Sequence, residues 1–211
     1  MEFRVSAVLL AAGSSKRMGC PKQLLPLGQK PAIRHCLDNI IAAGIQQIVV
    51  VLGAESNGAA AAFRDIPVTV VVNDRIGSEM AESVRMGLRA LESPSSGVLI
   101  CLGDHPLASA ETMRTVTLAH RESPDDIIIP VHKRRRGHPS LFPSALLDEI
   151  FSGGTLRNII DKHSRRVRMI EVPDEGVILD MDTPEDYENM VKRAGFRGER
   201  QDDRSSPGNA L

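Results

Sequence analysis

A loop rich in glycine, hydroxyl and positively charged side chains follows the first apolar run of the chain. Residues 11–22 read AAGSSKRMGCPK, in which Lys16, Arg17 and Lys22 carry positive charge. Small side chains let backbone N–H groups approach a ligand closely, and hydroxyls and cations complete a cradle for phosphate. The spacing fits neither the G-x-G-x-x-G dinucleotide motif nor the G-x-x-x-x-G-K-[ST] motif. The loop therefore predicts phosphate binding of another type, with a solvated surface loop as the alternative.

A carboxylate follows the fourth expected strand of the chain. Residues 98–102 are apolar, and the next four residues read GDHP. In phosphate chemistry Mg²⁺ is held by one or two carboxylates together with phosphate oxygens, so Asp104 suits a magnesium ligand. The alternative is that Asp104 only caps a helix that begins after Pro106.

Short β-branched runs alternate with helical stretches along most of the chain. The expected strands cover residues 5–10, 46–52, 68–72, 98–102, 127–129 and 167–172. The expected helices cover residues 31–43, 56–64, 80–91, 110–120, 156–163 and 184–194, with a short one near Ala145. This alternation predicts a single doubly wound α/β domain with a mostly parallel, Rossmann-like sheet over residues 1–195. In such sheets ligands lie beyond the carboxyl ends of the strands, where the loop and Asp104 fall.

The overall composition excludes several classes of protein. With 42% hydrophobic and 25% charged residues, the 211-residue chain has enough apolar surface to fold, and only residues 196–211 are expected to be a disordered tail. A net charge of −1, one Tyr and no Trp argue against nucleic acid as a partner. No apolar run approaches the roughly 20 residues that span a bilayer, so no membrane partner is expected. Three cysteines without a C-x-x-C pair indicate a reducing, cytoplasmic setting.

The residues of the loop carry a resemblance to a known family. The string L-A-A-G-x-S-x-R-M-G-x-x-K over residues 10–22, followed by L-L-P-L, resembles the signature of the MobA-like nucleotidyltransferases, and within them looks most like the molybdenum cofactor cytidylyltransferases. The resemblance implies that the loop wraps a nucleoside triphosphate, with Arg17 and Lys22 on its phosphates as catalytic groups. It assigns nucleotide binding to Leu10, Ala11, Ala12, Gly13, Ser15, Arg17 and Lys22. Guanylyltransferases of the family typically read L-A-G-G, so Ala12 implies CTP rather than GTP.

The same resemblance implies a metal site of two carboxylates. The family has Gly-Asp-x-Pro after this strand, with Asp104 on the metal, and His105 replaces a commoner Met or Gln. The second carboxylate comes from the D-x-D-T-P-E-D segment at residues 180–186, where Asp182 is preferred over Asp180. Taken locally, this segment is also a helix start, which accounts for its threonine and proline but not for the two alternating aspartates.

Two further segments resemble substrate-binding parts of the family. The stretch that begins at Asn73 resembles the N…G-M-x-S-S-[LV]-R-x-G region near the base and ribose, which assigns Asn73 and Ser83. The basic segment at residues 133–142 resembles the R-G-[HN]-P-x-L-F element on the acceptor side, which assigns Arg136 and His138 to an anionic pterin phosphate. The alternatives are a turn into a helix for the first segment and a solvated charge run for the second.

The resemblance covers residues 5–194 and implies a Mg²⁺-dependent cytidylyltransferase with CTP and the molybdopterin cofactor as substrates. The acceptor phosphate would attack the α-phosphorus and release pyrophosphate, and a molybdoenzyme or its chaperone is the implied protein partner. Two alternatives remain: the same chemistry with GTP or a sugar-phosphate acceptor, and a non-catalytic accessory protein that only binds the cofactor. Lys22, Asp104 and Asp182 favour catalysis, because binding alone needs no metal carboxylates.

Overall fold

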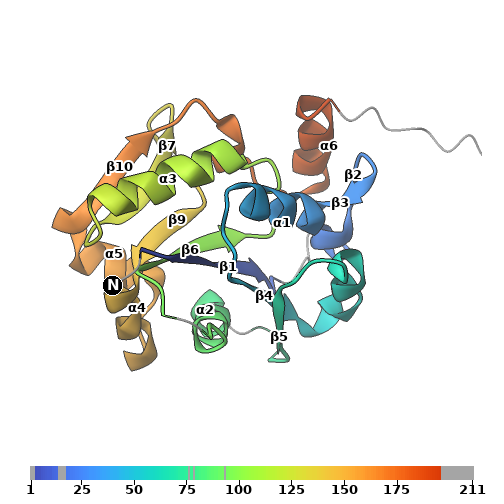
Figure 1. Ribbon diagram of the computed structural model, residues 1–211. Helices are drawn as coiled ribbons and strands as arrows, with labels where there is room; N and C mark the ends of the chain where they lie inside the picture. Colours follow the sequence, from blue (N-terminus) through green and yellow to red (C-terminus); the bar gives the residue numbers. More distant parts are fainter. Residues whose placement is uncertain (1–2, 14–17, 76, 78, 93, 196–211) are drawn as a thin grey trace, which may run out of the picture.

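A central β-sheet with helices on both faces forms the molecule (Figure 1). The computed structural model describes residues 3–13, 18–75, 77, 79–92 and 94–195. The main sheet contains β1 (Val5–Ala11), β4 (Ile48–Gly53), β5 (Thr69–Asn73), β6 (Gly97–Leu102), β7 (Ile127–His132), β8 (Arg135–Arg136), β9 (Ser140–Pro143) and β10 (Val167–Glu171). Its strand order is β10-β7-β9-β6-β1-β4-β5, with β8 paired to β7. A small second sheet pairs β2 (Pro26–Leu27) with β3 (Lys30–Pro31).

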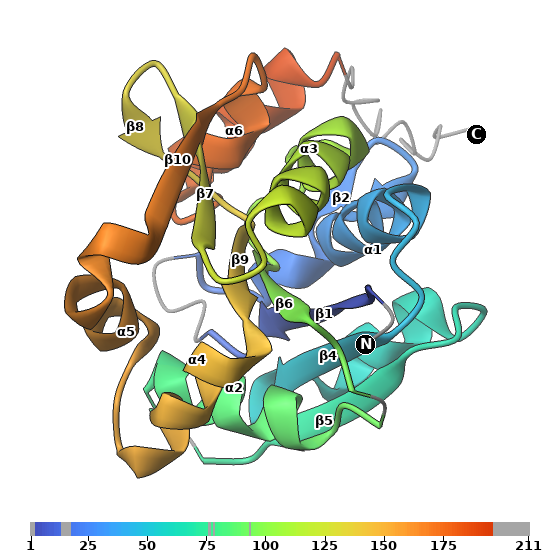
Figure 2. The same ribbon diagram turned by 60° about the vertical axis from the view of Figure 1, so that its left-hand side comes forward.

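Helices cover both faces of the main sheet, as the doubly wound prediction requires. The α-helices are α1 (Ala32–Ala42), α2 (Met80–Arg89), α3 (Ala110–Glu122), α4 (Ser144–Leu147), α5 (Leu156–Lys162) and α6 (Pro184–Arg193). The 3₁₀ helices are η1 (Lys22–Leu24), η2 (Ala54–Phe63), η3 (Asp148–Ser152), η4 (Ser164–Arg166) and η5 (Glu175–Ile178). In Figures 1 and 2, α1 and α3 pack on one face, while α2 and α4 pack on the other. No helix within the described ranges is long and apolar enough to cross a bilayer.

The parallel half of the sheet was predicted correctly, and its central strand shows why. Every residue of β1 is buried, and its side chains alternate between two cores. Ala7 and Leu9 pack with α1 and α3, whereas Val8 and Leu10 pack with the α2 side. A parallel strand covered on both faces needs such a continuous apolar run. Strands β6, β1, β4 and β5 run parallel, so their carboxyl ends meet at one edge of the sheet.

The antiparallel strand β9 lies between β6 and β7, in a segment where no strand was expected. Proline and glycine punctuate residues 133–143, and such punctuation is typical of loops. Leu141 and Phe142 are nevertheless fully buried, and the sheet supplies hydrogen-bonding partners on both sides of the strand. Ser140 pairs with Ile100 in an antiparallel register. The beginning of β9, rather than its end, therefore lies near the carboxyl end of β6.

The α-helix expected over residues 56–64 is a 3₁₀ helix, η2, over Ala54–Phe63. Ser56, Asn57 and Gly58 are residue types of low helix propensity. Ala59 is still buried against the core, so the segment keeps its packing role without α-helical geometry.

Candidate active site

A short 3₁₀ turn holds Lys22 at the carboxyl-terminal edge of the sheet. The neighbouring Gln23 is only 1% exposed, and its Nε2 donates to the carbonyl oxygen of Ala11 at 3.0 Å and, more weakly, to that of Gly13 at 3.5 Å. These bonds tie η1 to the end of β1 and so fix where the loop returns to the sheet. Gln23 was not among the predicted site residues, although its place between Lys22 and the apolar run that begins at Leu24 was an available signal.

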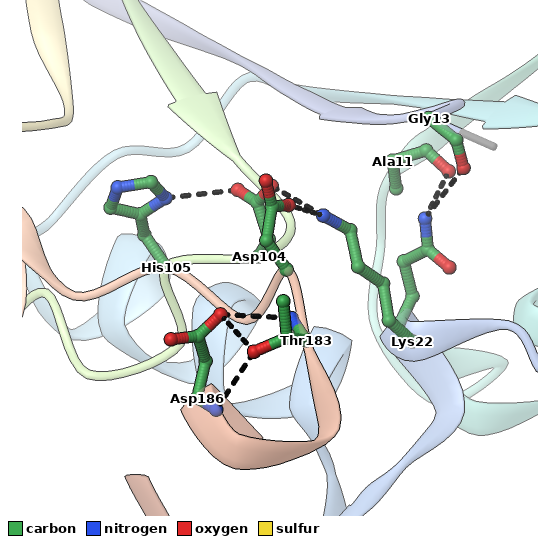
Figure 3. A network of polar contacts seen from close by, with 9 residues as sticks. Ala11, Gly13, Lys22, Asp104, His105, Thr183 and Asp186 are labelled. Atoms are coloured by element: carbon green, nitrogen blue, oxygen red, sulfur yellow. Dashed lines mark hydrogen bonds and ion pairs between the residues drawn. The ribbon is translucent and has the colours of Figure 1, made fainter. Parts of the chain in front are cut away.

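Lys22 bonds two carboxylates that come from distant parts of the chain. Its Nζ donates to Oδ2 of Asp104 at 2.7 Å and to Oδ1 of Asp182 at 2.8 Å. Figure 3 shows Lys22 extended toward Asp104, which follows β6. Because both oxygens bond one nitrogen, they face the same point. The structure thus brings together three residues that the sequence predicted separately.

The start of α6 carries Asp182 to this point. Thr183 and Asp186 form a capping box: the Thr183 hydroxyl accepts from the Asp186 N–H at 3.2 Å, and the Asp186 carboxylate accepts from the Thr183 N–H at 2.8 Å. The buried Met181 donates its N–H to the carbonyl oxygen of Asp104 at 3.0 Å. The helix-start interpretation therefore holds for Thr183 and Asp186, while the backbone link leaves Asp182 beside Asp104.

The charges at this point shift each other's pKa. Burial alone would lower the pKa of the Lys22 ammonium, but the Asp104 charge and the hydrogen bonds to both carboxylates outweigh it and raise the pKa. Burial alone would raise the pKa of Asp104, yet the hydrogen bond and charge of His105, together with Lys22, hold it well below its usual range. At neutral pH Lys22 is charged and Asp104 is ionised.

His105 borders the Asp104 carboxylate on the side away from Lys22 (Figure 3), and His138 lies beside His105. His105 Nδ1 lies 2.9 Å from Oδ1 of Asp104. The His105 and His138 rings meet edge to face, with centroids 5.2 Å apart. Burial, followed by the neighbouring His105, lowers the pKa of His138 to about 4, so this ring is neutral at pH 7. The predicted acceptor-side His138 is thus linked to Asp104 through His105, whose role the sequence left open.

The oxygen donors at this point fit a small divalent cation. Mg²⁺ and Mn²⁺ prefer oxygen ligands, and Mg²⁺ is usually bound by one or two carboxylates plus substrate phosphates. Asp104 and Asp182 supply two converging carboxylates. Among the described residues no group of three or more His, Cys, Asp or Glu side chains forms a metal-binding cluster, so phosphate and water oxygens would complete the shell.

A cavity of about 140 Å³ opens beside Lys22. It is lined by Leu10, Ala12, Gly13, Lys22, Gln23, Met80, Ser83, Leu102 and Asp104. Most of these were predicted to bind nucleotide or metal, whereas Gln23, Met80 and Leu102 were not. Asn73 reaches the cavity through Ser83, since its Nδ2 donates to the Ser83 hydroxyl at 2.9 Å.

Several predicted residues do not join this cluster. The side chain of Ala11 is buried in the core, and its contribution is the carbonyl oxygen that accepts from the η1 amide. Arg136 is exposed on β8, opposite Val131. Ser15 and Arg17 lie outside the residues that the structure describes.

Two other cavities lie outside this site. One of about 740 Å³ opens at the opposite edge of the sheet, beside Val5, Ile48 and Thr69. Ligands of parallel sheets bind at the carboxyl ends of the strands. The site at Lys22 is therefore the better candidate active site, although its cavity is smaller. Another, of about 210 Å³, is lined by Asp180, whereas Asp182 is the aspartate that bonds Lys22.

Comparison with known proteins gives the class of the chain. A family model described as the MobA-like NTP transferase domain matches residues 7–167. The chain therefore belongs to the MobA-like NTP transferase family and is a nucleotidyltransferase of that class. Nicotine blue oxidoreductase of Paenarthrobacter nicotinovorans is 30% identical over 199 residues, covering 89% of this chain and 96% of that protein.

Solved structures share the fold. Rv0371c from Mycobacterium tuberculosis H37Rv is similar with a TM-score of 0.79 and 29% identity, over 91% of this chain and 99% of the other. A structure of Rv0371c in complex with manganese has a TM-score of 0.73 and 27% identity, over 91% and 100%. A nucleotidyl transferase from Methanothermobacter thermautotroptrophicus has a TM-score of 0.78 over 90% and 97%, and its 22% identity supports the fold alone.

Proposed function

We propose that the protein is a Mg²⁺-dependent cytidylyltransferase that transfers CMP from CTP to the terminal phosphate of the molybdopterin cofactor and releases pyrophosphate. The observation that carries the proposal is the convergence of Lys22, Asp104 and Asp182 on one point. A protein that only bound a phosphate would gain nothing from two carboxylates at the phosphate site, since they repel it. The manganese complex of the similar Rv0371c supports a divalent cation in proteins of this kind.

Each residue of the cluster has a defined task in this reaction. When bound to Asp104 and Asp182, a divalent cation would neutralise the negative charge of the phosphates. Lys22 is charged and would exchange its carboxylate partners for phosphate oxygens, while Gln23 holds the turn that presents it. An acceptor phosphate oxygen forms the new bond to the α-phosphorus, and the electron pair of the broken bond leaves with pyrophosphate. The acceptor phosphate is already ionised, so rate enhancement comes from positioning and charge neutralisation.

The choice of substrates rests on residues at the two ends of the site. Ala12 lines the cavity, and its methyl group would narrow the room for a purine, which supports CTP over GTP. On the acceptor side, the neutral His138 lies against His105, and Arg135 and Arg136 expose positive charge on β8. This arrangement suits a substrate with a polar ring system and an anionic phosphate.

Product analysis by mass spectrometry tests the proposal. The protein is incubated with each of the four NTPs, Mg²⁺ and molybdopterin, and Asp104→Asn is assayed beside it with circular dichroism to check folding. We expect the cytosine dinucleotide of the cofactor from CTP alone, and its loss in Asp104→Asn. A guanine product would contradict the choice of base. Transfer to a sugar phosphate alone would contradict the acceptor, and tight cofactor binding without any transfer would indicate an accessory protein.

The relative named nicotine blue oxidoreductase raises a redox alternative. The loop at residues 11–22 lacks the G-x-G-x-x-G dinucleotide motif, and hydride transfer gives paired carboxylates no evident task. Incubation with nicotine blue and a reduced nicotinamide, followed by absorbance, tests this alternative directly. Reduction of the dye that survives Asp104→Asn, without nucleotidyl transfer, would overturn the proposed function.

A further inference from the structure

The two oxygens of the Asp104 carboxylate have different partners. Oδ1 lies 2.9 Å from Nδ1 of His105, and Oδ2 lies 2.7 Å from Nζ of Lys22 (Figure 3). Because the carboxylate is ionised and can only accept, Nδ1 of His105 must carry the proton of this bond. One oxygen is therefore committed to His105, and the other faces the point shared with Asp182.

The His105 ring is held in place from several directions. Its backbone N–H donates to the carbonyl oxygen of Leu102 at 3.2 Å, and its own carbonyl accepts from Ala108 at 3.3 Å. The side chain is 10% exposed and meets the His138 ring edge to face. A donor fixed in this way cannot follow a rotating carboxylate, so it favours one orientation of Asp104.

We propose that His105 is a positioning residue that limits Asp104 to one cation-facing oxygen and thereby favours small octahedral cations over Ca²⁺. This inference rests on the cation site of the proposed function. Ca²⁺ takes about 6–8 oxygens and readily accepts both oxygens of one carboxylate, whereas Mg²⁺ requires a near-ideal octahedron with ligands at about 2.0–2.1 Å. Because Oδ1 is bonded to His105, a cation that binds both oxygens of Asp104 must break that hydrogen bond. A cation that binds Oδ2 alone leaves it intact.

Metal binding to the free protein provides the test. Mn²⁺ is the probe, because free Mn²⁺ gives an electron paramagnetic resonance signal that is lost on binding, and Ca²⁺ affinity follows from competition. The variants are His105→Ala, which removes the donor, and His105→Asn, which keeps an N–H near the position of Nδ1. The matched control is His163→Ala, since His163 makes a similar 2.8 Å bond to Glu149 on a different part of the surface.

We expect His105→Ala to weaken Mn²⁺ binding by about tenfold or more, the range found when the partner of a metal ligand is removed. Ca²⁺ binding should change less, so the preference for Mn²⁺ over Ca²⁺ should fall by a similar factor. His105→Asn should restore most of that preference, and His163→Ala should leave both affinities unchanged. A purely structural role would lower the melting temperature and leave the ratio of the two affinities intact.

An unchanged ratio in His105→Ala, or equal losses for both metals, would overturn the inference while leaving the proposed function standing. The variant Asp104→Asn distinguishes a failure of this inference from a failure of the proposed cation site. If wild type and Asp104→Asn bind Mn²⁺ equally, the cation is held elsewhere, and both the inference and the metal part of the proposed function are wrong.

Discussion

Replacing Lys22 by methionine should make the free protein bind Mn²⁺ more tightly. The Lys22 ammonium bonds the same carboxylates of Asp104 and Asp182 that a cation would use, so cation and ammonium compete for these oxygens. Methionine keeps much of the side-chain volume and removes the charge. The same variant should bind CTP more weakly, because it lacks the cation that we expect on the phosphates.

The size of the effect follows from the geometry. A hydrogen bond to a charged group contributes about 1.5–3 kcal/mol. Lys22 is 11% exposed, but the side chains of Asp104 and Asp182 are 22% and 32% exposed. When the ammonium is removed, water can therefore replace part of the hydrogen bonding that the two carboxylates lose. We therefore take about 1.5 kcal/mol for both bonds together, which corresponds to roughly a tenfold lower Kd for Mn²⁺.

Titration of each protein with Mn²⁺, without nucleotide, measures this change. Lys30→Met is the matched control, because it removes the same charge from an exposed ion pair with Asp38. Calorimetry with CTP gives the second half of the prediction. If Lys22→Met leaves Mn²⁺ affinity unchanged or lowers it, the ammonium does not compete for the cation site, and the reasoning is refuted.

Three other perturbations address the base, the packing and a buried histidine. Ala12→Gly should reduce the preference for CTP over GTP, with a ceiling of roughly 10–200-fold, since a methylene-sized change in a pocket is worth about 1–3 kcal/mol; an unchanged kcat/KM ratio would place base choice elsewhere. Gly176→Ala should destabilise the fold by about 1–3 kcal/mol or more in urea unfolding, because the new Cβ would collide with the backbone of Leu107. Gly154→Ala, which has ordinary room, is its neutral control. The pKa of His138 is lowered to about 4, so the unfolded chain binds a proton that the native state does not, and stability should fall as the pH drops from about 7 to about 4, by at most about 3 kcal/mol. His138→Gln should flatten that decline, and an unaltered pH profile would show that the histidine does not contribute to it.

The parallel half of the fold could be predicted because each of its strands has a recognisable pattern in its own residues. The apolar run of β4 (Ile48–Gly53) is covered on both faces, and the run itself is the signal. The antiparallel β9 could not be found in this way, because it is four residues long and ends at Pro143. Its identity as a strand depends on pairing with β6 and β7, which no pattern within the four residues reveals.

The site, like the fold, was predictable where the signal is local and not where it depends on distant residues. Lys22, Asp104 and Asp182 stand in motifs and were predicted singly, but their mutual bonding depends on how α6 docks, which no local pattern encodes. Gln23 and His105 escaped assignment because an amide or an imidazole acquires its role from the atom that it bonds. For Gln23 that atom is a backbone carbonyl oxygen, which is present at every position of the sequence. The metal and substrate roles of all these residues stay predictions until tested.

The link between Lys22 and Asp182 spans 160 residues, against 82 for the link to Asp104. The longer loop adds only about 0.6 kcal/mol of closure entropy, because that cost rises with the logarithm of length. Its larger consequence concerns biosynthesis. At about 5–20 residues per second, a ribosome adds Asp182 roughly 4–16 s after Asp104. During that interval the nascent chain contains Lys22 and Asp104 but not yet Asp182. If Asp182 holds the cation as proposed, nucleotidyl transfer can begin only once α6 has emerged and docked.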